Sequence, residues 1–231
     1  MARIYQRVFN TLIVREAKLT LVVLVGCVRL GKHKHLPPPS LEELGLESFG
    51  RPGERLSGVR LLKPKKFRFQ LLADFIETNF DASMRVLDVG GGKGLLTYLL
   101  RLRGYAACVV EPESQVLPGK YKDLNTNKRV KIPQGESVPR IAENFEVEIA
   151  EHFDLMVGLH AHGSNLKMLE AAARYKKPCV LMPCCVIGES STPTPGESWF
   201  KWLVHMAEEA GLGVEYFCLN FKGQNVGFIA R

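Results

Sequence analysis

The sequence predicts an α/β protein with a doubly wound, mostly parallel sheet of seven strands, an antiparallel C-terminal hairpin and a basic N-terminal extension. Three observations support this prediction. From Arg85 onward, short apolar runs alternate with segments of helical spacing, as expected when each strand is followed by a covering helix. A glycine-rich turn joins the first of these runs to a helix. A polar turn that contains Gly223 joins the last two runs.

The individual elements follow from apolar spacing and turn residues. Apolar runs predict six strands: Arg85–Val89, Ala106–Val110, Phe153–Leu159, Pro178–Met182, Val214–Phe221 and Val226–Ala230. We expect the seventh strand within Glu143–Ile149, beyond a long polar loop around Gly119–Lys131. Helical spacing predicts four helices: Phe67–Phe80, Leu95–Arg103, Asn165–Arg174 and Ser198–Ala210.

Charge divides the chain into two unequal parts. Residues 1–70 contain 14 Lys/Arg and 5 Asp/Glu, a net charge of +9, and the rest contain 17 and 19, a net charge of −2. We therefore predict a basic extension and connector over residues 1–62, followed by one domain over residues 63–231. Because basic surfaces attract phosphate backbones, RNA is the expected partner of residues 1–70. A solvated charged face without a partner is the alternative.

Apolar runs and cysteine usage favour a cytoplasmic protein. Thr11–Val14 and Leu19–Val28 are shorter than the roughly 20 residues that a membrane helix needs, so we interpret both as strands. The six cysteines lie mostly in apolar contexts, which is typical of reduced, buried thiols rather than of a disulfide framework. Residues 1–15 contain three arginines, so an organelle transit peptide is an alternative location signal.

The glycine-rich turn is the strongest functional signal. It reads Asp88-Val-Gly90-Gly-Gly92-Lys-Gly94 between a buried strand and a helix, where free backbone N–H groups favour an anionic group. The dinucleotide fingerprint would need glycine at Leu95, and a P-loop would need Ser or Thr after its Lys. Glu111 ends the next strand, where a carboxylate can accept both hydroxyls of a ribose.

This pattern resembles motif I of the class I (Rossmann-like) methyltransferases, which use S-adenosyl-L-methionine (SAM). In that family the glycine loop lies under the methionine part of the cofactor, and the acid after the second strand binds the ribose. The resemblance implies a SAM-dependent methyltransferase with these cofactor-binding residues: Asp88, Gly90, Gly92, Gly94 and Glu111.

A second group of residues follows two later predicted strands: His160, His162, Cys184 and Cys185. Since the carboxyl ends of parallel strands share one edge, this group should face the glycine loop. Leu159-His160-Ala-His162-Gly163 and the later Cys-Cys resemble a methyltransferase subgroup with Leu-His-x-Cys-Gly, similar to tRNA ribose 2′-O-methyltransferases. The resemblance covers about residues 63–231, and His162 departs from it because the pattern has Cys there.

Three interpretations of this second group remain open. His160 and His162 are catalytic candidates, because imidazole titrates near neutral pH and can act as a base or orient a nucleophile. The four side chains could instead bind zinc, but the spacing matches no common zinc motif, so we expect no metal. A packed, hydrogen-bonded structural role is the third interpretation.

These signals favour a SAM-dependent methyltransferase that acts on RNA, either tRNA or rRNA. The cofactor part of this hypothesis depends on residue spacing, and the RNA part depends on charge and the subgroup resemblance. A protein or small-molecule substrate, or a non-catalytic SAM-binding scaffold, are the alternatives.

Overall fold

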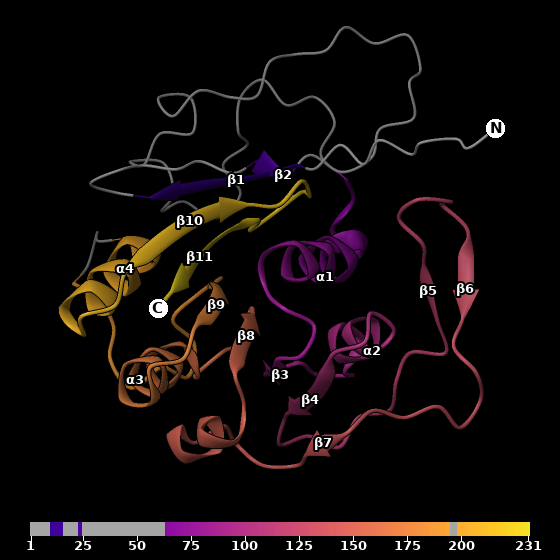
Figure 1. The fold of residues 1–231 in the computed structure, drawn as a ribbon, viewed down its shortest axis with the longest axis horizontal. Helices are drawn as coiled ribbons and strands as arrows, with labels where there is room; N and C mark the ends of the chain where they lie inside the picture. Colours follow the sequence, from indigo (N-terminus) through magenta and orange to yellow (C-terminus); the bar gives the residue numbers. More distant parts are fainter. Residues whose placement is uncertain (1–9, 16–22, 25–62, 195–197) are drawn as a thin grey trace, which may run out of the picture.

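The computed structural model describes residues 10–15, 23–24, 63–194 and 198–231 (Figure 1). Among these residues it contains a nine-stranded sheet in the order β2-β1-β10-β11-β9-β8-β3-β4-β7. Its strands are β1 (Asn10–Arg15), β2 (Val23–Leu24), β3 (Arg85–Val89), β4 (Ala106–Val110), β7 (Arg140–Ile141), β8 (Leu155–Leu159), β9 (Cys179–Met182), β10 (Val214–Cys218) and β11 (Val226–Ala230).

Seven of these strands form the predicted sheet. β9, β8, β3, β4 and β7 are mutually parallel, and β11 and β10 add an antiparallel hairpin next to β9. The predicted fold class is therefore confirmed. β1 extends the sheet because it pairs antiparallel with β10, in the register Leu12 to Cys218.

Helices cover both faces of the sheet. α1 (Arg68–Asn79) and α2 (Leu95–Arg101) pack on one face, and α3 (Asn165–Tyr175) and α4 (Trp199–Glu209) pack on the other (Figure 1). Successive residues of β3 alternate between the two cores, since Val86 packs with α1 and α2 whereas Leu87 packs with α3 and α4. This alternation is the two-residue side-chain period of a strand that is covered on both faces.

The segment between β4 and β8 differs from the prediction. No strand lies within Glu143–Ile149; the third parallel strand is β7, a two-residue strand that pairs with Val109 and Val110 of β4. Of the apolar residues in this segment, Val147 and Ile149 belong instead to a 3₁₀ helix, η2 (Val147–His152). Its buried residues Val147 and Ala150 are three positions apart, which is the period of a 3₁₀ helix.

The expected polar loop around Gly119–Lys131 is an antiparallel hairpin. It consists of β5 (Lys120–Lys122) and β6 (Arg129–Lys131), which form a separate two-stranded sheet. The hairpin is docked on the helices through an edge-on contact between Tyr98 and Tyr121 and through a hydrogen bond from Gln70 to Asp123. The hairpin was not predicted because each strand has three residues with a single apolar one, Tyr121 or Val130, which is too short to show an alternation.

Most of the basic extension lies outside the described residues. β1 agrees with the strand predicted at Thr11–Val14, and only Val23 and Leu24 of the predicted strand Leu19–Val28 are described. The boundary at residue 62 stays a prediction, and so does the transit-peptide alternative. Among the described residues, no helix is long and apolar enough to cross a membrane.

Candidate cofactor and active site

The glycine loop connects the end of β3 to the start of α2. Gly94 has a φ of +76° and stands at the N-terminus of α2, and a Cβ added there would lie 2.8 Å from Cγ2 of Val138. A Cβ on Gly92 would meet nothing within 4 Å. Both positions favour glycine through a positive φ, which is +52° at Gly92. Gly94 is in addition enclosed by Val138, whereas Gly92 borders open space that a side chain would fill.

Asp88 supports this loop from within the protein. Its buried carboxylate accepts hydrogen bonds from the backbone N–H and the hydroxyl of Thr97, at 3.2 and 2.8 Å. Burial raises the pKa of Asp88 to about 6, against the opposing effect of the Thr97 hydrogen bonds and the Arg140 charge. The carboxylate is thus ionised at neutral pH and fixes the first turn of α2 against β3.

Glu111 follows β4 and lies beside the glycine loop. Oε2 of Glu111 accepts a hydrogen bond from the backbone N–H of Gly92 at 3.1 Å, and Oε1 accepts one from Glu113 at 3.3 Å. Each carboxylate oxygen has a second lone pair, so the half-buried group can still accept two hydroxyls. The two parts of the predicted cofactor site are therefore in direct contact.

Arg140 is a residue of this region that the sequence did not reveal. Its Nη1 is buried and finds no hydrogen-bond partner among the described residues, and its Nη2 lies 3.4 Å from the position of a Cβ on Gly94. An unsatisfied guanidinium beside the loop fits a carboxylate such as that of a methionine group. Arg140 was not predicted because the strand was expected within Glu143–Ile149, whereas β7 begins at Arg140, three residues before that segment.

His160 follows β8 and is half-buried, with the unusual φ of +59°. Its Nε2 lies 3.2 Å from the backbone oxygen of Gln224, in the connection between β10 and β11. Because a carbonyl can only accept, Nε2 carries the proton and Nδ1 is the basic nitrogen. The pKa of His160 is lowered by burial and then by the charges of Lys65 and Arg68, against the effect of the Gln224 carbonyl, so the ring is neutral at pH 7.

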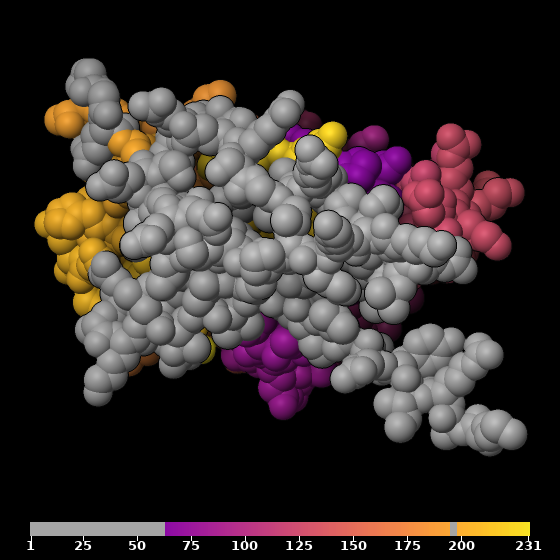
Figure 2. All heavy atoms as spheres, turned by 90° about the horizontal axis from the view of Figure 1, so that it is seen from above, coloured from indigo at the N-terminus to yellow at the C-terminus, as the bar shows by residue number. Residues whose placement is uncertain are grey.

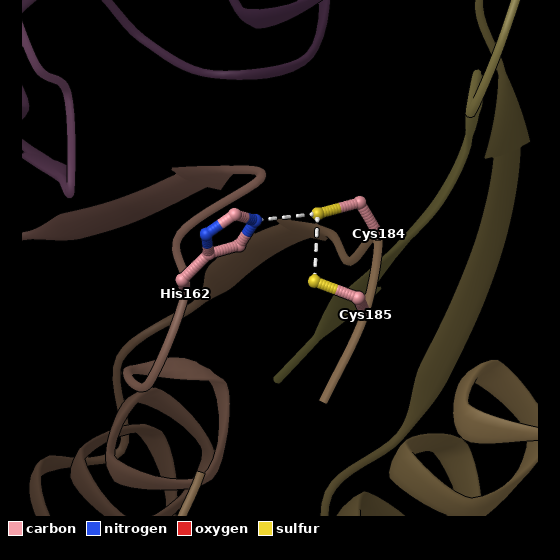
Figure 3. Close-up of side chains that lie close together, drawn as sticks. All are labelled: His162, Cys184 and Cys185. Atoms are coloured by element: carbon pink, nitrogen blue, oxygen red, sulfur yellow. Dashed lines mark hydrogen bonds between the residues drawn. The ribbon is translucent and has the colours of Figure 1, made fainter. Parts of the chain in front are cut away.

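His162, Cys184 and Cys185 form a separate cluster at the ends of β8 and β9 (Figure 3). Nε2 of His162 is 3.0 Å from Sγ of Cys184, which is 3.6 Å from Sγ of Cys185. Burial and the neighbouring Cys185 raise the pKa of the Cys184 thiol to about 11, with an opposing effect from Lys65. The four residues singled out in the sequence are thus divided, with His160 bonded to Gln224 and the other three together.

The residue between the two histidines connects them to the glycine loop. Ala161 is buried, and its Cα would lie 3.2 Å from a Cβ on Gly90. Gly90 in turn donates its N–H to the carbonyl of Val110, at the end of β4. As the strand order predicted, the glycine loop and the segment with His160 and His162 lie at the same edge of the sheet.

A comparison of the sequence with known families matches residues 65–217 to a methyltransferase domain. Comparison with curated proteins finds no match. Among solved structures, the chain is similar to 1,6-didemethyltoxoflavin-N1-methyltransferase from Burkholderia thailandensis, whose crystal structure holds 1,6-didemethyltoxoflavin and S-adenosylhomocysteine. The identity is 13%, the alignment covers 72% of this chain and 79% of that chain, and the TM-score is 0.42.

A second similar structure is a SAM-dependent methyltransferase from Aquifex aeolicus, with 19% identity, 74% of this chain and 94% of that chain covered, and a TM-score of 0.41. The assignment to a family depends on the domain match, which spans most of the chain and includes the glycine loop, Glu111 and His160. The chain therefore belongs to the methyltransferase domain family and is a SAM-dependent methyltransferase.

Proposed function

We propose that this methyltransferase modifies RNA, with tRNA or rRNA as the substrate. The observation that carries the proposal is a band of basic side chains next to His160. It begins at Lys65 and Arg68, both of which act electrostatically on His160, and it continues to the β5–β6 hairpin.

The start of this band is held in place by backbone contacts. Lys63 donates its N–H to the carbonyl of Asn220 and accepts a hydrogen bond from the N–H of Lys222. These contacts attach the segment before α1 to the β10–β11 connection, which also provides the Gln224 carbonyl to His160. The exposed Lys65 and the half-buried Arg68 are therefore fixed beside the candidate active site.

The hairpin extends the basic band outward. Residues 120–131 contain five Lys/Arg and one Asp. The pKa of Lys122 is lowered by burial and by the neighbouring charges of Lys66 and Arg129. Lys66, which precedes α1, therefore lies close to the basic residues of the hairpin. The hairpin protrudes at one end of the molecule in both views (Figures 1 and 2). A protruding basic hairpin that adjoins Lys66, next to the Lys65 that acts on His160, suits a long polyanion better than a small neutral substrate.

In this proposal His160 acts on the nucleophile. Bound SAM supplies an electrophilic methyl group on a sulfonium. Nδ1 of the neutral His160 can accept the proton of an attacking hydroxyl or amine, while Nε2 donates to Gln224 and fixes the ring. Lys65 and Arg68 would orient the adjacent phosphates, and alignment of the nucleophile supplies much of the rate in such a transfer.

The test is incubation of the full-length protein with methyl-labelled SAM and separate total-RNA, total-protein and small-molecule fractions. Label in tRNA or rRNA is the expected result. Label confined to protein or to small molecules would refute the RNA assignment while keeping the enzyme. Binding of SAM with no label in any fraction would indicate a non-catalytic scaffold.

A pair of charge variants tests the role of the hairpin. Lys120→Gln with Arg129→Gln should weaken RNA binding and reduce the slope of log K against log salt by about 0.7 per lost phosphate contact. The matched control is Lys176→Gln with Lys201→Gln, which removes one exposed charge just after α3 and one on α4. Equal effects of the two pairs would mean that the hairpin has no specific role.

A further inference from the structure

We propose that His162, Cys184 and Cys185 bind a zinc ion through one nitrogen and two sulfur ligands, with the fourth position open. Among the described residues, these three side chains are the group whose potential ligand atoms lie within 4.8 Å of one another (Figure 3). Histidine nitrogen and cysteine thiolate are the ligands that zinc prefers. This proposal replaces the expectation from spacing alone that no metal is bound.

The distances fit the size of a zinc ion. Zn–S bonds of about 2.3 Å at a tetrahedral angle place two sulfurs about 3.8 Å apart. The two Sγ atoms are 3.6 Å apart, so adjacent cysteines can here present both sulfurs to one ion. The same geometry with a Zn–N bond of about 2.05 Å needs an N–S distance of about 3.6 Å. The observed 3.0 Å must therefore widen slightly, and because His162 is exposed its ring has room to move.

The two loops that carry these ligands are held together independently of any metal. A Cβ on Gly163, next to His162, would lie 2.9 Å from the backbone oxygen of Gly188. Glu189 accepts hydrogen bonds from the N–H and the side-chain amide of Asn165, at 2.9 and 2.6 Å, and so attaches the later loop to the start of α3. Because both loops are already fixed in this way, metal binding has to restrict the ligand side chains but not the loops that carry them.

The ligand set indicates what kind of metal site this is. Two cysteines and one histidine with an open position are typical of zinc sites that bind water or a substrate atom, whereas structural sites have four protein ligands. We infer that the fourth ligand is a water or an electron-donating group of the substrate. In this assignment His162 is a metal ligand rather than a catalytic base, and His160 keeps its separate role.

The main experiment measures metal content and ligand identity on the untagged full-length protein, purified with a reductant. We expect about one zinc per chain by elemental analysis. Replacement of zinc with Co²⁺ should produce a thiolate-to-cobalt charge-transfer band in the near ultraviolet. This spectrum needs no variant, so it stays informative even if substitutions impair folding.

Variants then locate the site. Cys185→Ser and His162→Ala should each weaken zinc binding more than ~100-fold, because loss of a direct ligand exceeds the effect of outer residues. Cys108→Ser and His205→Ala are controls, because they remove a cysteine and a histidine that do not belong to the cluster. Cys108 is on β4, and His205 is exposed on α4. A third control is His33→Ala with His35→Ala, which tests the histidine pair of the basic extension as a competing site.

Three results would overturn the proposal. The first is wild-type protein without zinc and without the cobalt band. The second is zinc content unchanged in Cys185→Ser and His162→Ala. The third is zinc lost only from the variant of His33 and His35. Calorimetry of SAM binding to Cys185→Ser should give wild-type affinity, which separates the metal site from the cofactor site.

Discussion

Replacement of Glu111 by alanine should weaken cofactor binding without unfolding the protein. Glu111 directly follows β4, and its half-buried carboxylate uses one lone pair of each oxygen for the N–H groups of Gly92 and Glu113. Each oxygen keeps a second lone pair that can accept a ribose hydroxyl, and the neighbouring Gly92 borders open space. A hydrogen bond to a charged group contributes about 1.5–3 kcal/mol, and we take this as the total loss because water partly replaces the carboxylate.

This loss corresponds to a dissociation constant about 10- to 150-fold higher, at about 1.4 kcal/mol for each factor of ten. Isothermal calorimetry with S-adenosylhomocysteine measures it, and circular dichroism checks that the variant is folded. Glu111→Gln keeps the shape and one acceptor oxygen, so its loss should be smaller. Glu113→Ala is the matched control, because Glu113 is exposed two residues further on. Equal affinities of wild type and Glu111→Ala would refute the ribose assignment.

Three further predictions concern neighbouring residues. Asp88→Asn should remove one contribution to the pH dependence of stability. Because the pKa of Asp88 is about 6 in the folded protein, folded Asp88 binds protons more readily than unfolded Asp88. As the pH rises from 4 to 6, the free energy of unfolding measured with urea should therefore fall by about 2 kcal/mol more in the wild type than in Asp88→Asn. Gly94→Val should destabilise the protein thermally, because its side chain is opposed both by the φ of +76° and by contact with Val138. Gly92→Val is opposed only by the φ of +52°, so it should be destabilised less and should lose SAM binding in calorimetry. His160→Ala should keep SAM affinity and lower the methylation rate by about 100-fold, and an unchanged rate would mean a structural role.

The parts of the fold that the sequence predicted are those set by local patterns. β3, β4 and β11 have the predicted bounds because their apolar runs end at turn residues. β10 ends at Cys218, whereas the prediction extended it to Phe221. The apolar residues after Cys218 do not continue the pairing of β10 but make other backbone contacts. Leu219 bonds to Asn225, and Phe221 forms a bridge with Lys63. These are tertiary contacts, which a strand pattern does not contain.

In the candidate site, too, local patterns could be predicted from the sequence and tertiary contacts could not. The glycine loop and Glu111 could be found because a strand, a turn and the next strand bring them together within a short segment. The partner of His160 could not, since Gln224 is 64 residues away and contributes a backbone carbonyl that any residue could supply. The separation of His160 from the cysteines had no sequence signal either, because His160 and His162 are only two positions apart and point to different partners.

The pairing of β1 with β10 affects how the basic extension can be studied. An extension that ends at residue 62 suggests a removable arm, yet residues 12–15 of β1 pair with residues 215–218 of β10. Deletion of residues 1–36 would leave the edge of β10 unpaired, and exposed strand edges promote aggregation. A loss of RNA binding after such a deletion would therefore combine lost charge with lost structure. Substitution of single basic residues, as in the hairpin variants, keeps the sheet intact and isolates the effect of charge.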